Sequence, residues 1–252
     1  MISLEGKKTL VTGGSRGIGR ATALLFARAG SDVALSYVSR EDKALEVKAA
    51  IEEMGRECLV FRSDVSLLRD VKRMVEEIIS RWGTIDVLVN NAGIWTYGEM
   101  GNMEEDVWSQ TMKVNLDGVF YVCNEVVPHM KRKKRGWIIN VSSTAAQRGE
   151  AFHSHYAATK GAINSLTKSL AVELAADNIR VNCVAPGWVE TDMCTGVFSD
   201  SRFREEVINS IPLKRIATPE DIAGAILFLA SDLAFHITGE IINVNGGSVL
   251  CS

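Results

Sequence analysis

Short apolar segments rich in β-branched residues alternate along the chain with longer segments in which apolar residues recur every three or four positions. The short segments predict strands and the longer ones amphipathic helices, because side-chain direction repeats every two residues in a strand and every 3.6 in a helix. The predicted strands are residues 9–12, 33–37, 58–61, 85–90, 137–141, 179–184 and 240–244. The predicted helices are residues 17–30, 41–54, 71–82, 104–134, 155–176 and 219–231.

This alternation predicts a single α/β domain over residues 1–252, built as a doubly wound, Rossmann-type parallel sheet of about seven strands with helices on both faces. The chain shows no linker, no low-complexity tract and no repeat of fixed period. Ligands of such sheets bind beyond the carboxyl ends of the strands, so we expect the chemically active residues directly after each strand.

The composition is that of an ordinary globular protein, with 46% hydrophobic and 23% charged residues in a chain of 252. A net charge of −3 argues against nucleic-acid binding, because proteins of that class are usually basic.

The sequence shows no signal peptide and no apolar stretch long enough to span a membrane. The cysteines are odd in number and form no C-x-x-C pair, lying at Cys58, Cys123, Cys183, Cys194 and Cys251. We therefore expect a soluble, cytoplasmic protein without a disulfide framework or a metal site.

A glycine-rich turn follows the first predicted strand, with the sequence Thr12-Gly13-Gly14-Ser15-Arg16-Gly17-Ile18-Gly19. Its G-x-x-x-G-x-G spacing differs from the G-x-G-x-x-G of the commonest dinucleotide fingerprint, but the physics is shared. Glycines let the backbone approach a pyrophosphate, and a helix N-terminus offers free N–H groups and the positive end of its dipole. An ordinary glycine-rich turn is the alternative, but the position between a strand and a helix favours a nucleotide site.

The end of the second strand predicts which nucleotide is bound. NAD-specific sites usually place a carboxylate there to hold the ribose hydroxyls, whereas this chain has Tyr37. Arg16 in the glycine-rich turn and Arg40 after the strand could meet a 2′-phosphate, which a carboxylate would repel. We therefore predict a preference for NADP(H) over NAD(H). The alternative is that Arg40 is only a solvated surface charge.

Tyr156 and Lys160 lie four residues apart on a predicted helix and therefore share a face. A nearby ammonium favours the phenolate, so we expect Lys160 to lower the pKa of Tyr156 and make it a general acid–base. A Y-x-x-x-K match is weak evidence alone, but further polar or turn-forming segments follow other predicted strands. These are Asp64, Asn90-Asn91-Ala92-Gly93, Ser142-Ser143 and Pro186-Gly187, while Asn115, a poor helix former, lies inside the predicted helix 104–134.

Together these motifs resemble the short-chain dehydrogenase/reductase family in its compact single-domain branch, from Thr12-Gly13 to the ending at Gly247. The resemblance implies hydride transfer between a nicotinamide and a substrate carbonyl, with no metal. It implies that Tyr156 donates the proton and that Lys160 holds the nicotinamide ribose. Ser143, thirteen residues before the tyrosine, would bond the substrate oxygen, and Asn115 would hold a water in a proton relay.

The motifs and the resemblance together indicate the residues that would bind the cofactor. They are Gly13, Ser15, Arg16, Gly17, Ile18, Gly19, Tyr37, Arg40, Asp64, Val65, Asn91, Ala92, Gly93, Tyr156, Lys160, Pro186, Gly187, Val189 and Thr191. Asn91 could instead brace the sheet edge, and we leave both readings open. The pair His153-x-His155 could suggest a metal, but a pocket-lining or surface position is favoured because no third ligand is near in sequence.

The segment 186–193 and the Val-Asn-Gly-Gly ending are most similar to β-ketoacyl-(acyl-carrier-protein) reductases. That similarity implies a β-ketoacyl thioester as substrate, on coenzyme A or an acidic carrier protein, beneath a lid at residues 192–211. Trp95, Phe152 and Trp188 suggest a partly apolar pocket. The basic run 131–135 could receive the carrier, although Asp177 stands where those reductases often have a basic residue.

Three alternatives to that function remain. They are reduction of a sugar, polyol or other small ketone; the reverse oxidation of a secondary alcohol; and a non-catalytic nucleotide sensor, which an intact Ser143, Tyr156 and Lys160 set argues against. The resemblance also implies a homotetramer paired through the stretches 104–134 and 155–176 and the apolar ending Val249-Leu250.

Overall fold

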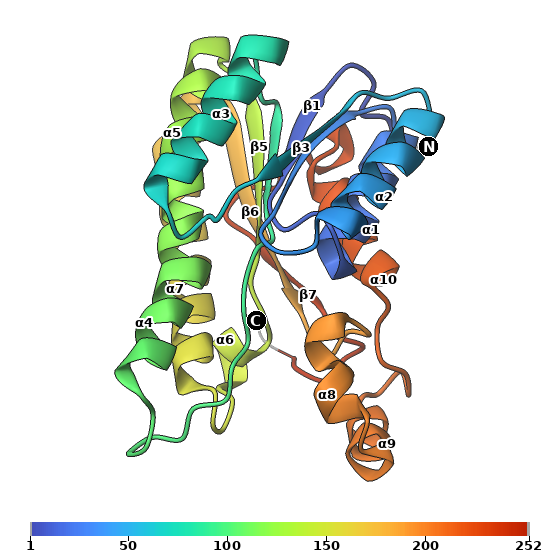
Figure 1. The fold of residues 1–252 in the computed structure, drawn as a ribbon, viewed down its shortest axis with the longest axis vertical. Coiled ribbons are helices and arrows are strands. Elements are labelled where there is room, and N and C mark those ends of the chain that lie inside the picture. Colours follow the sequence, from blue (N-terminus) through green and yellow to red (C-terminus); the bar gives the residue numbers. More distant parts are fainter. Residues whose placement is uncertain (1, 251–252) are drawn as a thin grey trace.

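The computed structural model describes residues 2–250 and contains one seven-stranded parallel sheet with the order β3-β2-β1-β4-β5-β6-β7 (Figure 1). Its strands are β1 Lys8–Val11, β2 Asp32–Tyr37, β3 Cys58–Arg62, β4 Val87–Asn90, β5 Gly136–Val141, β6 Ile179–Pro186 and β7 Ile241–Val244. The predicted fold class is confirmed. The strand order reverses between β1 and β4, which is where ligands bind in doubly wound sheets.

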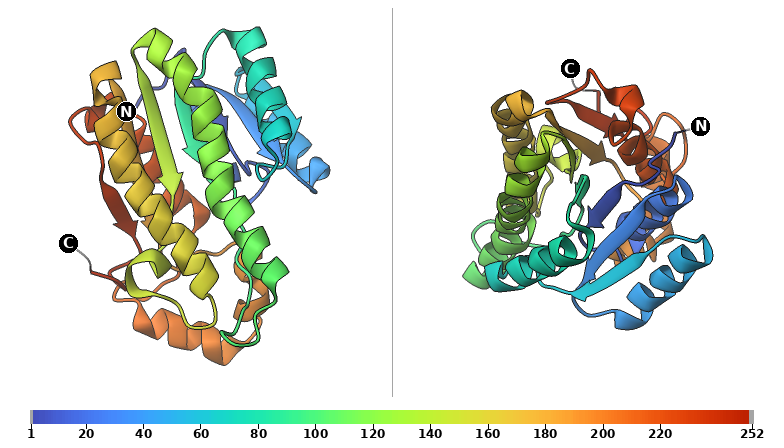
Figure 2. Two further views of the ribbon diagram at one scale, coloured as in Figure 1. Left: turned by 90° about the vertical axis from the view of Figure 1, so that its left-hand side faces the viewer. Right: turned by 90° about the horizontal axis from the view of Figure 1, so that it is seen from above.

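Helices cover both faces of the sheet, as the two sides of Figure 1 show. On one face lie α1 Gly17–Arg28, α2 Glu41–Glu53 and α10 Pro219–Leu229. On the other lie α3 Leu68–Trp82, α5 Gly118–Lys133 and α7 Ser154–Leu174, with α5 and α7 side by side (Figure 2, left). The remaining helices are α4 Glu105–Met112, α6 Ala145–Arg148, α8 Thr195–Phe198 and α9 Ser201–Ser210, with 3-10 turns at Ala175–Asp177, Asp192–Cys194 and Asp232–Ala234.

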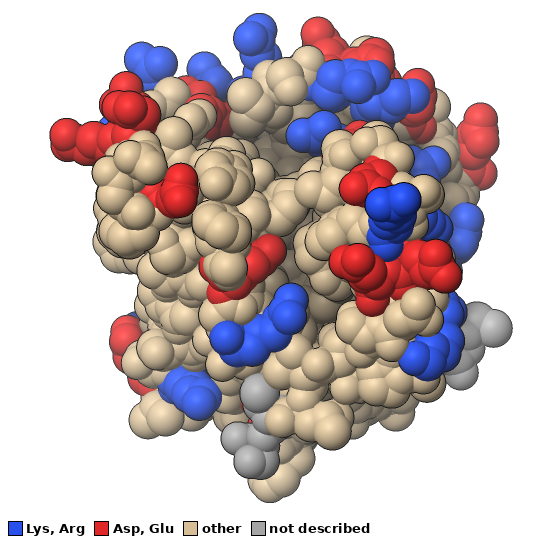
Figure 3. Space-filling model, turned by 90° about the horizontal axis from the view of Figure 1, so that it is seen from below, with Lys and Arg blue, Asp and Glu red and all other residues tan. Residues whose placement is uncertain are grey.

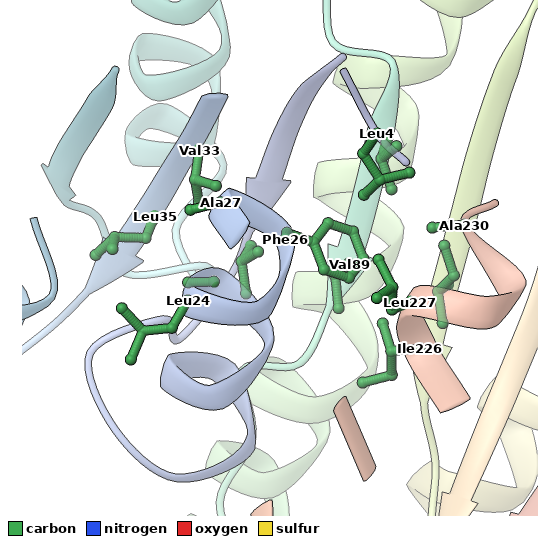
Figure 4. Close-up of a cluster of buried hydrophobic side chains, with 14 of the residues drawn as sticks. Leu4, Leu24, Phe26, Ala27, Val33, Leu35, Val89, Ile226, Leu227 and Ala230 are labelled. Carbon is green, nitrogen blue, oxygen red and sulfur yellow. The ribbon is translucent and has the colours of Figure 1, made fainter. Parts of the chain in front are cut away.

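Alternating side chains of the central strands supply both cores. In β4, Val87 and Val89 pack toward α1 and α10, whereas Leu88 packs toward α3 and α5. Figure 4 shows the first of these clusters, where Phe26 of α1 lies between Val89 and Leu227 of α10. Burying a side chain of this size stabilises the fold by about 2–3 kcal/mol. This packing fixes α1, and therefore its N-terminus, beside the carboxyl ends of β1 and β4.

The predicted helix 104–134 is two α-helices joined by a π-helical turn at Lys113–Asp117. The extra residue in that turn brings Asn115 inward. There its side-chain amide both accepts a hydrogen bond from the backbone of Ile94 and donates one to it. Oδ1 accepts from Ile94 N at 2.8 Å, and Nδ2 donates to Ile94 O at 2.9 Å. The unfavourable helix propensity of asparagine was thus a correct sign of something unusual, although the sequence did not predict a π turn.

The segment expected as a lid, residues 192–211, contains a 3-10 turn, α8 and α9. No helix was predicted here from the sequence pattern. The sequence signal for α9 that was missed is Asp200, which caps the helix by accepting hydrogen bonds from the backbone N–H groups of Arg202 and Phe203.

Within residues 2–250, no helix is long and apolar enough to cross a membrane. Cys251 lies outside the described residues.

Candidate active site

The carboxyl ends of the strands open into a cleft of about 450 Å³. Figure 3 views this end of the molecule, where acidic and basic side chains surround a central hollow. Of the residues predicted to bind the cofactor or to act in catalysis, all line the cleft except Gly19 and Asn115. Both of these lie directly behind its wall, against residues that do line it. The predicted site therefore comes together as one surface.

The glycine-rich turn after β1 lines one end of the cleft. Gly13 and Gly17 adopt positive φ angles of 65° and 52°, which favour glycine. A Cβ on Gly19 would lie only 2.2 Å from the carbonyl oxygen of Gly13, so this glycine serves close packing. Helix α1 begins at Gly17, and the preceding residue Arg16 provides no side-chain cap. Its first backbone N–H groups are therefore available to an anion in the cleft.

Asn91 ties this turn to the neighbouring strand. Its Nδ2 donates to Thr12 O at 2.9 Å and to Gly13 O at 3.1 Å. The Thr12 hydroxyl in turn accepts from the backbone N–H groups of Asn91 and Ala92, at 3.0 and 3.1 Å. Asn91 also lines the cleft. The two readings left open by the sequence are therefore compatible, because the residue braces the sheet edge and faces the ligand site at once.

Two arginines stand at the end of the cleft where β2 finishes. Arg40 makes a bidentate pair with Asp42, with N···O distances of 3.0 and 2.7 Å, and Arg16 lies 3.6 Å from Asp192. The Arg40 guanidinium holds the pKa of Asp42 down at about 2. Tyr37, at the end of β2, is buried and lines the cleft. Arg40 is exposed and paired with a neighbouring exposed carboxylate, so the alternative of a surface charge stands beside that of a 2′-phosphate contact.

The catalytic candidates meet at the other end of the cleft. Helix α7 places the Lys160 Nζ 5.6 Å from the centroid of the Tyr156 ring, and that ammonium donates to Val141 O at 2.8 Å. The Ser143 side chain is close enough to the Tyr156 phenol to act on its pKa, in the lowering direction. Ser142 instead donates its hydroxyl proton to the carbonyl oxygen of Lys160, at 3.0 Å. Of the two serines, Ser143 therefore stands beside the phenol.

Burial governs the proton affinities of this group. It raises the pKa of Tyr156, against the smaller effect of Ser143, and lowers the pKa of Lys160 to about 8. The sequence predicted that Lys160 lowers the pKa of Tyr156. In this structure the pKa of the phenol is raised by burial, and Lys160 is not among the groups that shift it. The Lys160 ammonium instead bonds the Val141 carbonyl.

Gly93 separates Lys160 from Asn115. A Cβ at Gly93 would lie 3.2 Å from Asn115 Oδ1 and 3.6 Å from Lys160 Nζ. Only a glycine leaves the space between these two polar atoms open. Asn115 is fully buried, and its Oδ1 accepts one hydrogen bond from the protein, so a second lone pair faces this space.

The substrate end of the cleft contains residues that sequence reasoning did not single out. Glu150 and Arg148 both line it, and burial raises the pKa of Glu150. Trp95 and Trp188 line it as expected, but Phe152 stacks on Tyr97 outside it. A largely buried carboxylate two residues before an aromatic carries no sequence signal that distinguishes it from an ordinary loop acid.

The two histidines support the wall from behind. The His153 ring stacks on Trp95, with centroids 4.3 Å apart, and His155 Nε2 bonds the Thr96 hydroxyl at 2.9 Å. Neither histidine is among the residues that line the cleft. Within residues 2–250, no three His, Cys, Asp or Glu side chains are grouped so that they could hold a metal ion.

The basic run 131–135 does not lie at the cleft entrance, so that expectation is wrong. It ends α5 and immediately precedes β5, which places it at the amino end of the sheet, opposite the cleft. Most of its charges are paired with acids. Lys131 and Lys134 pair with Asp177, Lys133 with Asp86 and Arg135 with Asp232. Asp177, which departs from the reductase pattern, therefore pairs with two of the cations of this run.

Known proteins resemble this chain over nearly its whole length. A family model described as Enoyl-(Acyl carrier protein) reductase matches residues 13–248. A 3-oxoacyl-(acyl-carrier-protein) reductase from Chlamydia pneumoniae is 44% identical over 246 residues, which cover 98% of each chain. Two solved structures superpose closely. One, described as a short-chain alcohol dehydrogenase from Sinorhizobium meliloti, has a TM-score of 0.94 at 34% identity and covers 98% of this chain and 97% of its own. The other is a gluconate 5-dehydrogenase from Burkholderia cenocepacia in complex with NADP and tartrate, with a TM-score of 0.93, 34% identity and coverage of 98% and 96%.

Proposed function

This chain belongs to the short-chain dehydrogenase/reductase family of oxidoreductases, and we propose that it uses NADP(H) to reduce a β-ketoacyl thioester to the secondary alcohol. The observation that carries the proposal is the meeting of Ser143, Tyr156 and Lys160 in the same cleft as the glycine-rich turn. The substrate class is drawn from the name of the Chlamydia pneumoniae relative and from the 186–193 motif.

The cleft fits a nicotinamide dinucleotide. The glycine-rich turn allows close backbone approach, the uncapped N-terminus of α1 suits a pyrophosphate, and Arg16 and Arg40 suit a 2′-phosphate. Pro186, Gly187, Val189 and Thr191 line the segment of the cleft that would receive the nicotinamide. The bound nicotinamide supplies the hydride chemistry, which no protein side chain can provide.

The protein groups would then manage the proton. Tyr156 donates its phenolic proton to the substrate oxygen, and the Ser143 hydroxyl stabilises the charge that develops there. The raised pKa of Tyr156 keeps the phenol protonated and ready to donate. Lys160, whose pKa near 8 lies close to physiological pH, returns a proton to the tyrosine. Asn115 supports this relay by holding a water across the space beside Gly93.

Purified protein mixed with acetoacetyl-CoA tests the proposal, with NADPH and NADH compared by nicotinamide absorbance. We expect NADPH oxidation, and a loss of about 10²–10⁴-fold in kcat for Tyr156→Phe. The variant should still bind NADPH, as nicotinamide fluorescence would show. Faster turnover with NADH would overturn the cofactor preference. Undiminished turnover by Tyr156→Phe would overturn the assigned proton donor.

A second candidate function is the oxidoreduction of a small polyhydroxylated acid. Arg148 and Glu150 place a cation and a carboxylate at the substrate end, where an unsubstituted acyl chain makes no use of them. The Burkholderia cenocepacia structure is named a gluconate 5-dehydrogenase. Turnover of gluconate with NADP, in the absence of turnover of acetoacetyl-CoA, would favour this function over the first.

We further propose a homotetramer. Large apolar side chains are exposed on the helices that would pair, with Phe120 on α5, Trp108 on α4 and Val172 on α7. Light scattering that gave the mass of one chain would overturn this proposal.

We propose a reducing, cytoplasmic compartment because Cys58, Cys123 and Cys183 are buried, unpaired thiols. A carrier protein would have to dock at the cleft face, because the basic run lies at the opposite end.

A further inference from the structure

An aromatic contact joins the two walls of the cleft at its substrate end. Trp95 follows β4 and Trp188 follows β6, and their ring centroids lie 6.0 Å apart at an interplanar angle of 88°. Both rings line the same cleft as Tyr156. At this separation an edge-to-face pair is in van der Waals contact, so no acyl chain passes between the rings.

Each ring is held in place from behind. Trp95 stacks on His153 at an interplanar angle of 6°, with ring centroids 4.3 Å apart. Trp188 packs against Phe198 of α8 and Phe203 of α9, with centroids 5.5 and 5.7 Å away. Moving either ring aside would break contacts with its own wall as well as the contact across the cleft. The contact between the two rings therefore closes this part of the cleft before any substrate binds.

Glu150 makes the same end of the cleft unfavourable for hydrocarbon. Its carboxylate lies 3.9 Å from His153 Nδ1, and its side chain is only 17% exposed. A long apolar chain laid over it would remove the remaining water without replacing its hydrogen bonds, which is unfavourable for a polar group. The carboxylate and the tryptophan pair thus act against the same kind of substrate.

We infer that the Trp95–Trp188 contact, backed by Glu150, restricts this enzyme to short β-ketoacyl groups. The inference rests on the proposed function, because it concerns which β-ketoacyl thioesters are reduced. Acetoacetyl thioesters fit in front of the ring pair, whereas a 3-oxododecanoyl chain must displace it. Trp95 and Trp188 are then specificity residues that make no contribution to the proton transfer itself.

The test compares kcat/KM for acetoacetyl-CoA and 3-oxododecanoyl-CoA, with NADPH. In the unaltered enzyme we expect at least a tenfold preference for acetoacetyl-CoA. Trp95→Leu should shrink that preference to within about threefold, chiefly by lowering KM for the long substrate. Trp188→Phe is a second, milder variant, because it retains aromatic packing against Phe198 and Phe203 but shortens the reach toward Trp95.

Phe235→Leu is the control. It removes an exposed aromatic ring that neither lines the cleft nor contacts the residues that hold Trp95 and Trp188, and it should leave the preference unchanged. Equal reduction of both thioesters by the unaltered enzyme would overturn the inference and leave the proposed function intact. So would folded Trp95→Leu and Trp188→Phe variants that kept the full preference. Reduction of neither thioester would overturn the proposed function, and the inference with it.

Discussion

The buried ammonium of Lys160, on α7, donates a hydrogen bond to the backbone carbonyl of Val141, the last residue of β5, at 2.8 Å. This bond anchors the long lysine side chain across the floor of the cleft. No carboxylate is among the groups that shift its pKa, so burial dominates and lowers the pKa from 10.5 to about 8. The lysine is therefore poised to exchange a proton near neutral pH.

The free energy of unfolding of the ligand-free protein should depend on pH because of this lysine. Between pH 8 and 10.5 the unfolded chain keeps a proton on Lys160 that the folded protein has released. The contribution of this residue to the free energy of unfolding therefore rises with pH across that window, by about 3 kcal/mol. Below pH 8 both states are protonated and the full burial penalty applies.

Urea denaturation of the wild-type protein and of Lys160→Met, from pH 7 to 10.5, measures this effect. The free energy of unfolding of the variant minus that of the wild type should fall as pH rises through the window. The buried thiols of Cys58 and Cys123 have pKa values raised to about 12 and also make stability pH-dependent above pH 9, but Lys160 is not among the groups that shift them, so their effect cancels between the two proteins. A difference that stays constant with pH would show that Lys160 has no lowered pKa.

Asn115→Ala should reduce both stability and turnover. The substitution leaves the N–H and C=O of Ile94 without their partner, a loss of about 1–3 kcal/mol in the free energy of unfolding. Asn182→Ala is the matched control. That buried amide also bonds backbone on both sides, at Ile237 O and Glu240 N, but these partners do not line the cleft, whereas Ile94 does. We expect a similar stability loss in the control with kcat retained; equal losses of kcat in both variants would assign Asn115 a structural role only.

Cofactor preference should respond to the Arg40–Asp42 pair in opposite directions. Arg40→Ala should raise KM for NADPH about three- to tenfold and leave KM for NADH unchanged, because only NADPH carries the 2′-phosphate. Asp42→Asn releases the guanidinium from its carboxylate partner and should lower KM for NADPH. Since the pKa of Asp42 is about 2, both effects should be the same at pH 6 and pH 9. A parallel change in KM for NADH would contradict the assignment.

Gly19→Ala should disrupt the phosphate-facing turn. The added methyl would lie 2.2 Å from the Gly13 carbonyl oxygen and 2.6 Å from Asn91 Nδ2, so the backbone must shift. Overpacking of this kind destabilises by about 1–3 kcal/mol. Thermal melts and NADPH titration should show a lower melting temperature and weaker binding. Gly224→Ala in α10, where an added Cβ meets nothing within 4 Å, should show neither; an unchanged Gly19→Ala protein would refute the close-packing role.

The architecture was predictable because each strand and helix carries a local periodic signal and the parallel order follows from their alternation. The seven strands and the main helices lie close to their predicted positions. The cleft was predictable for a related reason. Parallel strands bring their carboxyl ends to one edge, so residues after β1, β4, β5 and β6 had to converge there.

Features that depend on tertiary surroundings were not predictable. The π turn at Lys113–Asp117 forms because Asn115 finds a backbone partner in Ile94, 21 residues away. The direction of the pKa shift of Tyr156 depends on burial, which spacing along a helix does not report. The basic run 131–135 was misplaced because a charge run carries no information about which end of the sheet it occupies.

The hydrogen bonds of Asn91 bear on the order in which the parts of the protein fold. The backbone carbonyls of Thr12 and Gly13 are held by a side chain 79 and 78 residues further along the chain, respectively. A fragment that ended before β4 would contain every glycine of the turn but not the clamp that shapes it. The nucleotide site is therefore no autonomous N-terminal module: it matures only when β4 inserts beside β1, which couples cofactor recognition to completion of the central sheet.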